Sequence, residues 1–486
     1  MKSNQTETRI VLDNLPSNKS LSSLALRTLD HLSDLPLKRI KEAGIWRNRK
    51  AYFLNISYPS LQAMKTADLK KMKLSRVKNK SRRVAIYIHI PFCTAECYYC
   101  HYYKKFSQSK EQVDHYLDAV AGEIKLQKER LGRIEAESIY IGGGTPSYLN
   151  STQIDRLFKV VYENVELTGD AEVSFEIHPE SASSDRFEAL YRNRVNRINI
   201  GVESFEEGIL KSENRRHTAK DAIEAYEKAK SIGFSNINLD LIYGLRGQTL
   251  VGWEYNLNQI EKLHPPSVTL YYLRLKLGTP EFKLWKSDPT NFPTDTELLL
   301  MHAMNFEKIE KELKYIQNPV DWFISNEINF HKYQDHNWRK SDEVDLLGIG
   351  ASAYSYVDGW QYYNINDTNR YQEMIIGNKL PIWKAEFLDL TERMRRTVML
   401  GIKMGIERNF FFGLYGVDII DVFAPIWDAL DKIGLVNITP EMVELTYSGK
   451  LFADEVGQQF YSSQMKQRMM SIDPELVSTT WPQFNL

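Results

Sequence analysis

Three cysteines, Cys93, Cys97 and Cys100, are the only ones in the 486-residue chain, and they are spaced C-x3-C-x2-C. Three thiolates this close together can ligate three irons of a cubane iron–sulfur cluster and leave the fourth iron free for a small molecule. A zinc site with His89 or His101 as the fourth ligand is the alternative, but the spacing differs from that of common zinc knuckles. A disulfide would leave one cysteine over, so it explains the pattern less well.

A run of three glycines follows the next predicted strand, in Gly142-Gly143-Gly144-Thr145-Pro146. Glycines let a backbone approach a ligand closely and offer it N–H and C=O groups. The same run also fits a tight turn. Because it comes one strand–helix unit after the cysteines, we interpret it as a ligand-binding segment.

Carboxylates occur at the ends of two further predicted strands, as Glu176 and Glu203, and within a third, as Asp240. Such side chains can hold an ammonium or a hydroxyl group of a ligand. The alternative for Glu176 is an ordinary surface glutamate. Asp240 interrupts an apolar strand, where a charge is rarely idle, although a salt bridge to Arg215 or Arg216 would also explain it.

The elements that position these residues alternate between strand and helix from residue 84 onward. Six such units in sequence predict a parallel sheet that curls into a partial (β/α)6 barrel of the TIM type, with functional residues at the carboxyl ends of its strands. Ser151 is a candidate helix cap. The predicted strands cover residues 84–90, 138–141, 171–177, 197–202, 237–242 and 268–273, and the predicted helices cover 111–131, 151–164, 184–193, 218–232 and 250–263.

The chain is expected to have four parts: an N-terminal extension (1–83), the barrel (84–275), a connecting region that completes the barrel (276–380) and a C-terminal helical lobe of winged-helix type (381–486). The extension has leucines at helical spacing within 20–37 and a basic run over 65–83. That run either guides an anionic substrate or partner or, as we favour, forms a solvated helix face. Helices are predicted at 390–404 and 417–433, with a short strand at 443–446.

The bulk composition is that of an ordinary globular protein, with 43% hydrophobic and 26% charged residues and a formal net charge of −1. It suggests neither a nucleic-acid nor a membrane partner. No apolar run is long enough for a transmembrane helix, and the N-terminus lacks the apolar core of a secretion signal. We therefore expect a cytoplasmic, reducing location.

Several motifs together carry a family resemblance. They are Tyr87-Ile-His-Ile-Pro-Phe-Cys93, Gly142-Gly-Gly-Thr-Pro146, Gly201-Val-Glu-Ser-Phe205, Asn214-Arg-Arg-His217, Asn238-Leu-Asp-Leu-Ile-Tyr-Gly244, Gly348-Ile-Gly-Ala-Ser352 and Glu444-Leu-Thr-Tyr-Ser-Gly449. With them the chain resembles the oxygen-independent coproporphyrinogen III oxidase family of radical S-adenosylmethionine (SAM) enzymes, over most of its length from about Tyr87.

The resemblance implies a 4Fe–4S cluster on the three cysteines and two SAM molecules. It also implies a small-molecule substrate and an electron donor such as flavodoxin or ferredoxin. One SAM molecule is cleaved to a 5′-deoxyadenosyl radical. By position, the first SAM would meet Tyr87, Gly143, Glu176 and Tyr354. The second would meet Tyr99, Gly144, Thr145, Glu203, Arg215 and Asp240.

Two departures from the family pattern affect the expected reaction. Porphyrinogen-oxidising members carry a fourth cysteine where this chain has Tyr102, and the family usually has glutamine in place of Glu203. We therefore expect the second SAM to donate carbon for methylation or cyclopropanation of an unsaturated substrate, with Glu203 and Tyr99 as candidate catalytic residues. The alternatives are coproporphyrinogen III decarboxylation, haem ring opening, or a haem carrier that does not turn over.

Overall fold

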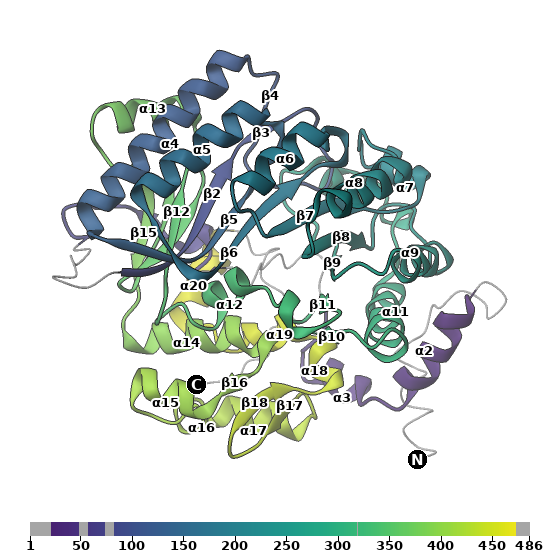
Figure 1. Cartoon of the computed structure of the whole chain (residues 1–486). Coiled ribbons are helices and arrows are strands. Elements are labelled where there is room, and N and C mark those ends of the chain that lie inside the picture. The colour runs from purple at the N-terminus through teal and green to yellow at the C-terminus, as the bar shows by residue number, and fades with distance from the viewer. Residues whose placement is uncertain (1–20, 48–56, 73–81, 318, 473–486) are drawn as a thin grey trace.

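The structure, a computed structural model, describes residues 21–47, 57–72, 82–317 and 319–472. Its centre is a mixed sheet of thirteen strands in the order β1-β15-β14-β13-β12-β2-β5-β6-β7-β8-β9-β11-β10. Helices lie along the outside of this sheet, and the C-terminal helices gather below it in Figure 1.

The predicted barrel is confirmed. Six neighbouring parallel strands form its wall: β2 (Arg82–Ile90), β5 (Ile134–Gly143), β6 (Glu166–Ile177), β7 (Arg197–Glu203), β8 (Ile237–Tyr243) and β9 (Ser267–Tyr272). The helices that follow them in sequence are α4 (Lys110–Leu131), α5 (Ser151–Asn164), α6 (Ser184–Arg192), α8 (Ala219–Ile232), α9 (Leu250–Leu263) and α11 (Asp295–Asn305). The cap of α5 is Asn150 rather than the predicted Ser151, because the Asn150 side chain accepts from the backbone N–H of Gln153 at 2.9 Å.

The two faces of the barrel wall differ in polarity because side chains alternate along a strand. One set, with Ile141, Phe175, Ile200 and Leu239 in neighbouring strands, is fully buried, as expected beneath covering helices. Each such side chain contributes about 1.5–3 kcal/mol of hydrophobic stabilisation. The alternate set points into the barrel and is largely polar, so the interior is built for ligand chemistry.

The region 276–380 is more regular than the sequence indicated. It adds β12 (Asp345–Ile349) parallel to β2, and then the antiparallel strands β13 (Tyr354–Val357) and β14 (Trp360–Asn364). At the opposite edge, β11 (Trp322–Ile324) pairs with β9 and β10 (Ile316–Gln317) with β11. These strands are only two to five residues long, so they show too little periodicity to be read from the sequence.

A buried carboxylate on α4 fixes the loop after β12. Glu123 is fully buried and accepts hydrogen bonds, each 2.7 Å, from the backbone N–H of Gly350, the side-chain amide of Asn364 and the hydroxyl of Tyr371. Burial raises the pKa of Glu123 to about 7. The contact ties the Gly348–Ser352 motif to the barrel.

The N-terminal segment lies against both the barrel and the C-terminal lobe. It contains α2 (Ser23–Ser33) and α3 (Leu37–Glu42), and the Arg39 side chain donates to the backbone oxygen of Lys432 at 2.6 Å. The basic run is not the predicted helix face where it is described: β1 (Lys65–Thr66) pairs with β15 (Ile382–Phe387), and Arg82 in β2 forms ion pairs. Its members between 73 and 81 lie outside the described residues.

The C-terminal lobe combines helices with a small three-stranded sheet. The predicted helix at 417–433 is two helices, since α16 ends at Val422 and α17 begins at Ala424, with Pro425 in its first turn. The predicted short strand is β18. The lobe contains α14 (Leu390–Gly401), α15 (Arg408–Tyr415), α16 (Ile419–Val422), α17 (Ala424–Lys432), α18 (Tyr447–Leu451), α19 (Ala453–Gln458) and α20 (Ser463–Ile472), with β16 (Ile406–Glu407), β17 (Val436–Ile438) and β18 (Met442–Leu445). The domain boundaries themselves stay a prediction.

Candidate active site

The cysteine loop leaves the carboxyl end of β2 and is held at several points by its own backbone. Tyr98 is fixed on both sides, because its N–H donates to the backbone oxygen of Glu213 at 3.3 Å and its carbonyl accepts from the N–H of Glu281 at 3.1 Å. Cys93 is buried, while Cys97 and Cys100 are partly exposed. The loop therefore presents its thiols from a fixed base.

Two polar side chains from elsewhere in the barrel approach the cysteine sulfurs, Thr145 from the segment after β5 and Arg215 from the connection between β7 and α8. The Thr145 hydroxyl lies 3.5 Å from Sγ of Cys93, and Nη1 of Arg215 lies 3.4 Å from Sγ of Cys97. Burial raises the pKa of Cys93 to about 12 and that of Cys100 above its ordinary value. Hydrogen bonds to sulfur and a nearby cation favour the thiolate form that iron requires.

At the three glycines where β5 ends, neighbouring groups leave too little room for a side chain. A Cβ on Gly144 would lie 2.9 Å from Sγ of Cys93 and 2.9 Å from the backbone oxygen of Phe92. Gly143 has a φ of +120°, and a Cβ there would lie 2.6 Å from the His89 ring. The segment therefore packs directly against the cysteine loop, as both the ligand-binding and the tight-turn interpretations would have it.

Glu176, at the end of β6, joins the glycine segment to a set of tyrosines. Its carboxylate accepts from the Tyr140 hydroxyl at 2.7 Å and from the N–H of Gly143 at 3.1 Å. Burial raises its pKa to about 7. Tyr354 packs beside Tyr87 with 6.1 Å between ring centroids. The residues predicted for the first SAM thus lie in one region.

Glu203 and Asp240 form a second group with Arg215 and Tyr99. Glu203 has a φ of 64°, and its carboxylate lies 3.6 Å from the Arg215 guanidinium. Asp240 accepts from Asn238 at 2.8 Å, whereas the sequence offered Arg215 or Arg216 as its partner. Burial raises the pKa of Asp240 to about 8, with the charges of Glu203 and Glu176 adding to the rise. Of the three partly buried carboxyls Glu176, Glu203 and Asp240, only Glu203 pairs with Arg215 among the described contacts, so the group suits a cationic ligand.

Three further residues near the proposed SAM sites, Tyr140, Tyr333 and Asn337, were not predicted from the sequence. Tyr140 stacks on Tyr333 at 4.9 Å between centroids, and Asn337 donates to the Tyr354 hydroxyl at 2.7 Å. Strand alternation could have found Tyr140. Tyr333 and Asn337 lie on α12 (Lys332–Trp338), whose contacts with the barrel no local pattern indicates.

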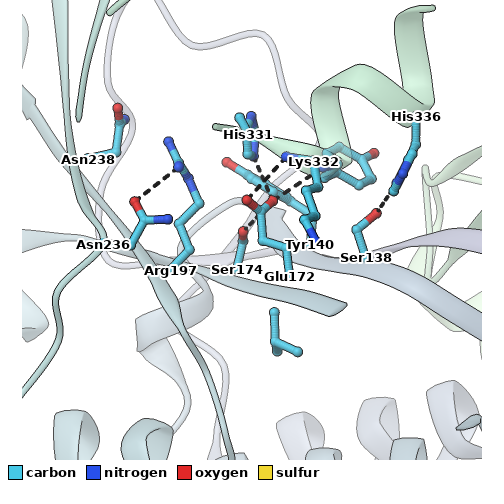
Figure 2. Close-up of polar contacts among 12 residues, drawn as sticks. Ser138, Tyr140, Glu172, Ser174, Arg197, Asn236, Asn238, His331, Lys332 and His336 are labelled. Atoms are coloured by element: carbon cyan, nitrogen blue, oxygen red, sulfur yellow. Dashed lines mark hydrogen bonds and ion pairs between the residues drawn. The ribbon is translucent and has the colours of Figure 1, made fainter. Parts of the chain in front are cut away.

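A buried polar layer lies along the same strands, nearer their amino ends. Figure 2 shows Glu172 receiving hydrogen bonds from Ser174 and from the backbone of α12, with Arg197 beside it. Nε2 of His331 lies 3.4 Å from Glu172, and Arg197 donates to Asn236 at 3.1 Å. The charged groups of this layer interact mainly with one another. We therefore interpret the layer as structural support for the site and not as a second reaction centre.

Among the described residues, no three His, Cys, Asp or Glu side chains are gathered around a point that one metal ion would fill. The ligands of a four-iron cluster lie further apart than those of a single metal ion, so this absence applies to single-ion sites. In the same part of the chain, no helix combines the length and apolarity needed to span a bilayer.

A barrel of parallel strands, with a three-cysteine loop after its first strand and acids at later strand ends, defines a protein of the radical SAM class. The model of the Radical SAM superfamily matches residues 87–258. The chain is 30% identical to the heme chaperone HemW of Bacillus subtilis (strain 168) over 373 residues, covering 76% of this chain and 97% of that protein.

Two further similarities concern another member of the same group. Oxygen-independent coproporphyrinogen III oxidase of Escherichia coli (strain K12) is 27% identical over 394 residues, covering 76% of this chain and 83% of that protein. The solved structure of coproporphyrinogen III oxidase (HemN) from Escherichia coli matches with a TM-score of 0.69 at 26% identity, covering 78% of this chain and 90% of that one. The chain belongs to the HemN/HemW family of radical SAM enzymes, a membership that implies a 4Fe–4S cluster and SAM.

Proposed function

We propose that this enzyme carries out SAM-dependent radical chemistry on a tetrapyrrole, using two SAM molecules bound at the carboxyl ends of the barrel strands. The observation that carries the proposal is the position of Arg215. Its guanidinium contacts both Sγ of Cys97 and the carboxylate of Glu203, so the cluster ligands and the acidic strand ends form one connected site.

Cys93, Cys97 and Cys100 would hold the 4Fe–4S cluster. The donors fit, because the three thiols lie close enough to interact electrostatically, and two of them have hydrogen-bond partners from other segments of the barrel, Thr145 and Arg215. When bound, the cluster supplies the electron that cleaves SAM to a 5′-deoxyadenosyl radical. The chain's own residues bind SAM, orient it and limit the access of water.

We assign the first SAM to Tyr87, Gly143, Glu176 and Tyr354. Desolvation raises the pKa of Glu176 to about 7, and an ammonium beside it would favour the ionised carboxylate and pair with it. The Tyr87 and Tyr354 rings, 6.1 Å apart, supply flat apolar surface on the same side.

The second SAM is assigned to the other group of strand ends. Glu203 and Asp240 would face its positive charge, while Arg215 would pair with its carboxylate. Tyr99 packs against a small apolar cluster that includes Ile242 and Leu273. The remaining members of this group are Gly144 and Thr145.

The support for a tetrapyrrole comes from the relatives, one named a heme chaperone and one a coproporphyrinogen III oxidase. They favour porphyrin or haem chemistry over the methylation or cyclopropanation that the two sequence departures suggested. One observation keeps carbon transfer as a second candidate: Glu203, in place of the usual glutamine, adds a buried carboxylate to the proposed second SAM site.

The test is anaerobic incubation of the reconstituted enzyme with SAM and dithionite, with coproporphyrinogen III or haem present in separate samples. We expect 5′-deoxyadenosine to form and the tetrapyrrole to be consumed, and the Cys93/Cys97/Cys100→Ala triple variant to do neither. Methyl-labelled SAM decides the second candidate, since label in the product would establish carbon transfer. Stoichiometric haem binding with no SAM cleavage would overturn the proposal in favour of a carrier.

A further inference from the structure

A second polar pocket lies outside the barrel interior, where β8, β9, α11, the N-terminal segment and the C-terminal lobe meet. It is lined by Tyr243 and Tyr272 from the strand ends and by Arg47, Arg274, Lys403 and Lys450 among others. Tyr271 and Tyr272 project from opposite faces of β9, because successive side chains alternate along a strand. The charges of Asp240 and Glu176 contribute to the raised pKa of Tyr271, so Tyr271 is the one on the side of the acidic site. We call it the Arg47 pocket.

The cations of this pocket are unequally neutralised. Arg274 and Lys403 both form an ion pair with the single carboxylate of Asp454, and Lys450 lies 3.5 Å from Glu310. Nε2 of His302 lies 2.9 Å from Asp321. Among the residues that the structure describes, Arg47 makes no ion pair with a carboxylate.

Arg47 is only 8% exposed, yet one of its terminal nitrogens is unused. Nη2 contacts His302 and donates to the backbone oxygen of Leu451 at 2.7 Å. Within the described chain, Nη1 has no hydrogen-bond partner. A buried guanidinium donor left without an acceptor is costly, so an acceptor that enters the pocket would be stabilised there.

Arg47 and Arg274 also both make cation–π contacts with the ring of Tyr272. The guanidinium carbons of Arg47 and Arg274 lie 4.9 and 5.5 Å from the centroid of Tyr272. Burial and the charge of Arg274 lower the pKa of Lys403 to about 7. Of the four cations that the described part of the lining contributes, Arg274 and Lys403 pair with Asp454 and Lys450 pairs with Glu310. Within the described residues, Arg47 is the one of these four without a carboxylate at ion-pair distance, so an entering anion would pair with it.

We propose that the Arg47 pocket binds an oxyanion, the carboxylate or phosphate group of a small ligand, with Arg47 as its principal donor. An arginine fork suits both groups. The site joins three parts of the chain, and its described lining shares no residue with the proposed SAM and cluster sites, so it does not depend on the function proposed above.

The experiment titrates the full-length protein with inorganic phosphate and, separately, with succinate, against potassium chloride at matched ionic strength. Binding is measured by calorimetry and by the thermal unfolding midpoint. We expect saturable binding of at least one anion and a rise in the midpoint. A response to phosphate alone or to succinate alone identifies the group. A response no larger than that to chloride would overturn the proposal.

Variants locate the site. Arg47→Gln should weaken binding at least about tenfold, as expected for loss of a charge-assisted donor. The matched control is Arg39→Gln, because Arg39 also joins the N-terminal segment to the C-terminal lobe but lies outside the pocket lining. Should Arg47→Gln not fold, Lys450→Gln replaces it, with an expected loss of about threefold. Unchanged affinity in the pocket variant, or an equal loss in Arg39→Gln, would contradict the assignment.

Discussion

Arg215 connects a sulfur ligand to a carboxylate: its guanidinium lies 3.4 Å from Sγ of Cys97 and 3.6 Å from the Glu203 carboxylate. Arg215 is itself held by the backbone oxygen of Gly201. A substitution of Arg215 therefore removes its contact with Cys97 and its contact with Glu203 together.

Replacing Arg215 with Met should leave Glu203 buried without its cation. We expect the rate of 5′-deoxyadenosine formation to fall at least about tenfold, which corresponds to about 1.4 kcal/mol in the barrier. Iron content should change little, since no cysteine is lost. The measurement is product formation per cluster, with the exposed neighbour Arg216→Gln as the control. Wild-type rates in Arg215→Met would contradict the role given to this residue.

Gly144→Ala should impair cluster incorporation, because the added Cβ would lie 2.9 Å from Sγ of Cys93 and from the backbone oxygen of Phe92. Iron and sulfide analysis after reconstitution should show less than about half the wild-type content, as overpacking displaces the cysteine loop. The control is Gly169→Ala, where a Cβ meets nothing within 4 Å. Equal iron content in the two variants would show that the close packing of Gly144 against Cys93 and Phe92 is not needed for cluster incorporation.

SAM affinity should depend on the ionisation of Asp240. Its pKa is raised to about 8 by burial and by the charges of Glu203 and Glu176, so the carboxyl is protonated below that pH, and the ionised form favours a cation. Affinity should therefore rise as the pH increases through about 8. Glu203→Gln removes one neighbouring charge and should move the rise to lower pH. Calorimetry of SAM binding between about pH 6.5 and 9 gives the pH profile of affinity for the wild type and for Glu203→Gln. The titration of SAM itself contributes equally to both profiles. Identical profiles in the two proteins would show that the charge of Glu203 does not affect the ionisation of Asp240.

Two buried carboxyls behind the cysteine loop should make stability depend on pH. Burial and the neighbouring Glu281 raise the pKa of Glu213 well above its ordinary 4.5, so the folded protein binds a proton that the unfolded chain releases. Stability from this group is therefore lost as the pH rises above about 4.5. Glu213→Gln should raise the unfolding midpoint at pH 8.5 relative to wild type and change it little at pH 4.

The control for that substitution is Glu224→Gln, on the exposed surface of α8. It should leave the midpoint unchanged at both pH values. If the unfolding midpoint of Glu213→Gln equals that of the wild type at pH 8.5, the folded protein does not hold an extra proton on the Glu213–Glu281 pair.

The barrel could be predicted because its information is local. Alternation marked the strands, and cysteine spacing, glycines and strand-end acids marked the site. The structure places these candidates together, while their roles as SAM ligands stay predictions. The contact between Arg215 and Cys97 could not be derived, since it joins residues 118 positions apart.

The strands of 276–380 were missed for a similar reason. β12 pairs with β2, and β11 with β9, across long intervals of chain, and each is too short to show a period. Tyr333 reaches the proposed SAM sites from α12, and Arg47 reaches its pocket from the N-terminal segment. Such positions are set by packing between distant elements, which no local pattern encodes.

The three hydrogen bonds that converge on Glu123 have a consequence for evolution. Gly350, Asn364 and Tyr371 each depend on the same carboxylate, so losing it strands three donors at once. A lineage that replaces Glu123 must find new acceptors at all of them, and residues 123, 364 and 371 should vary together among relatives or not at all.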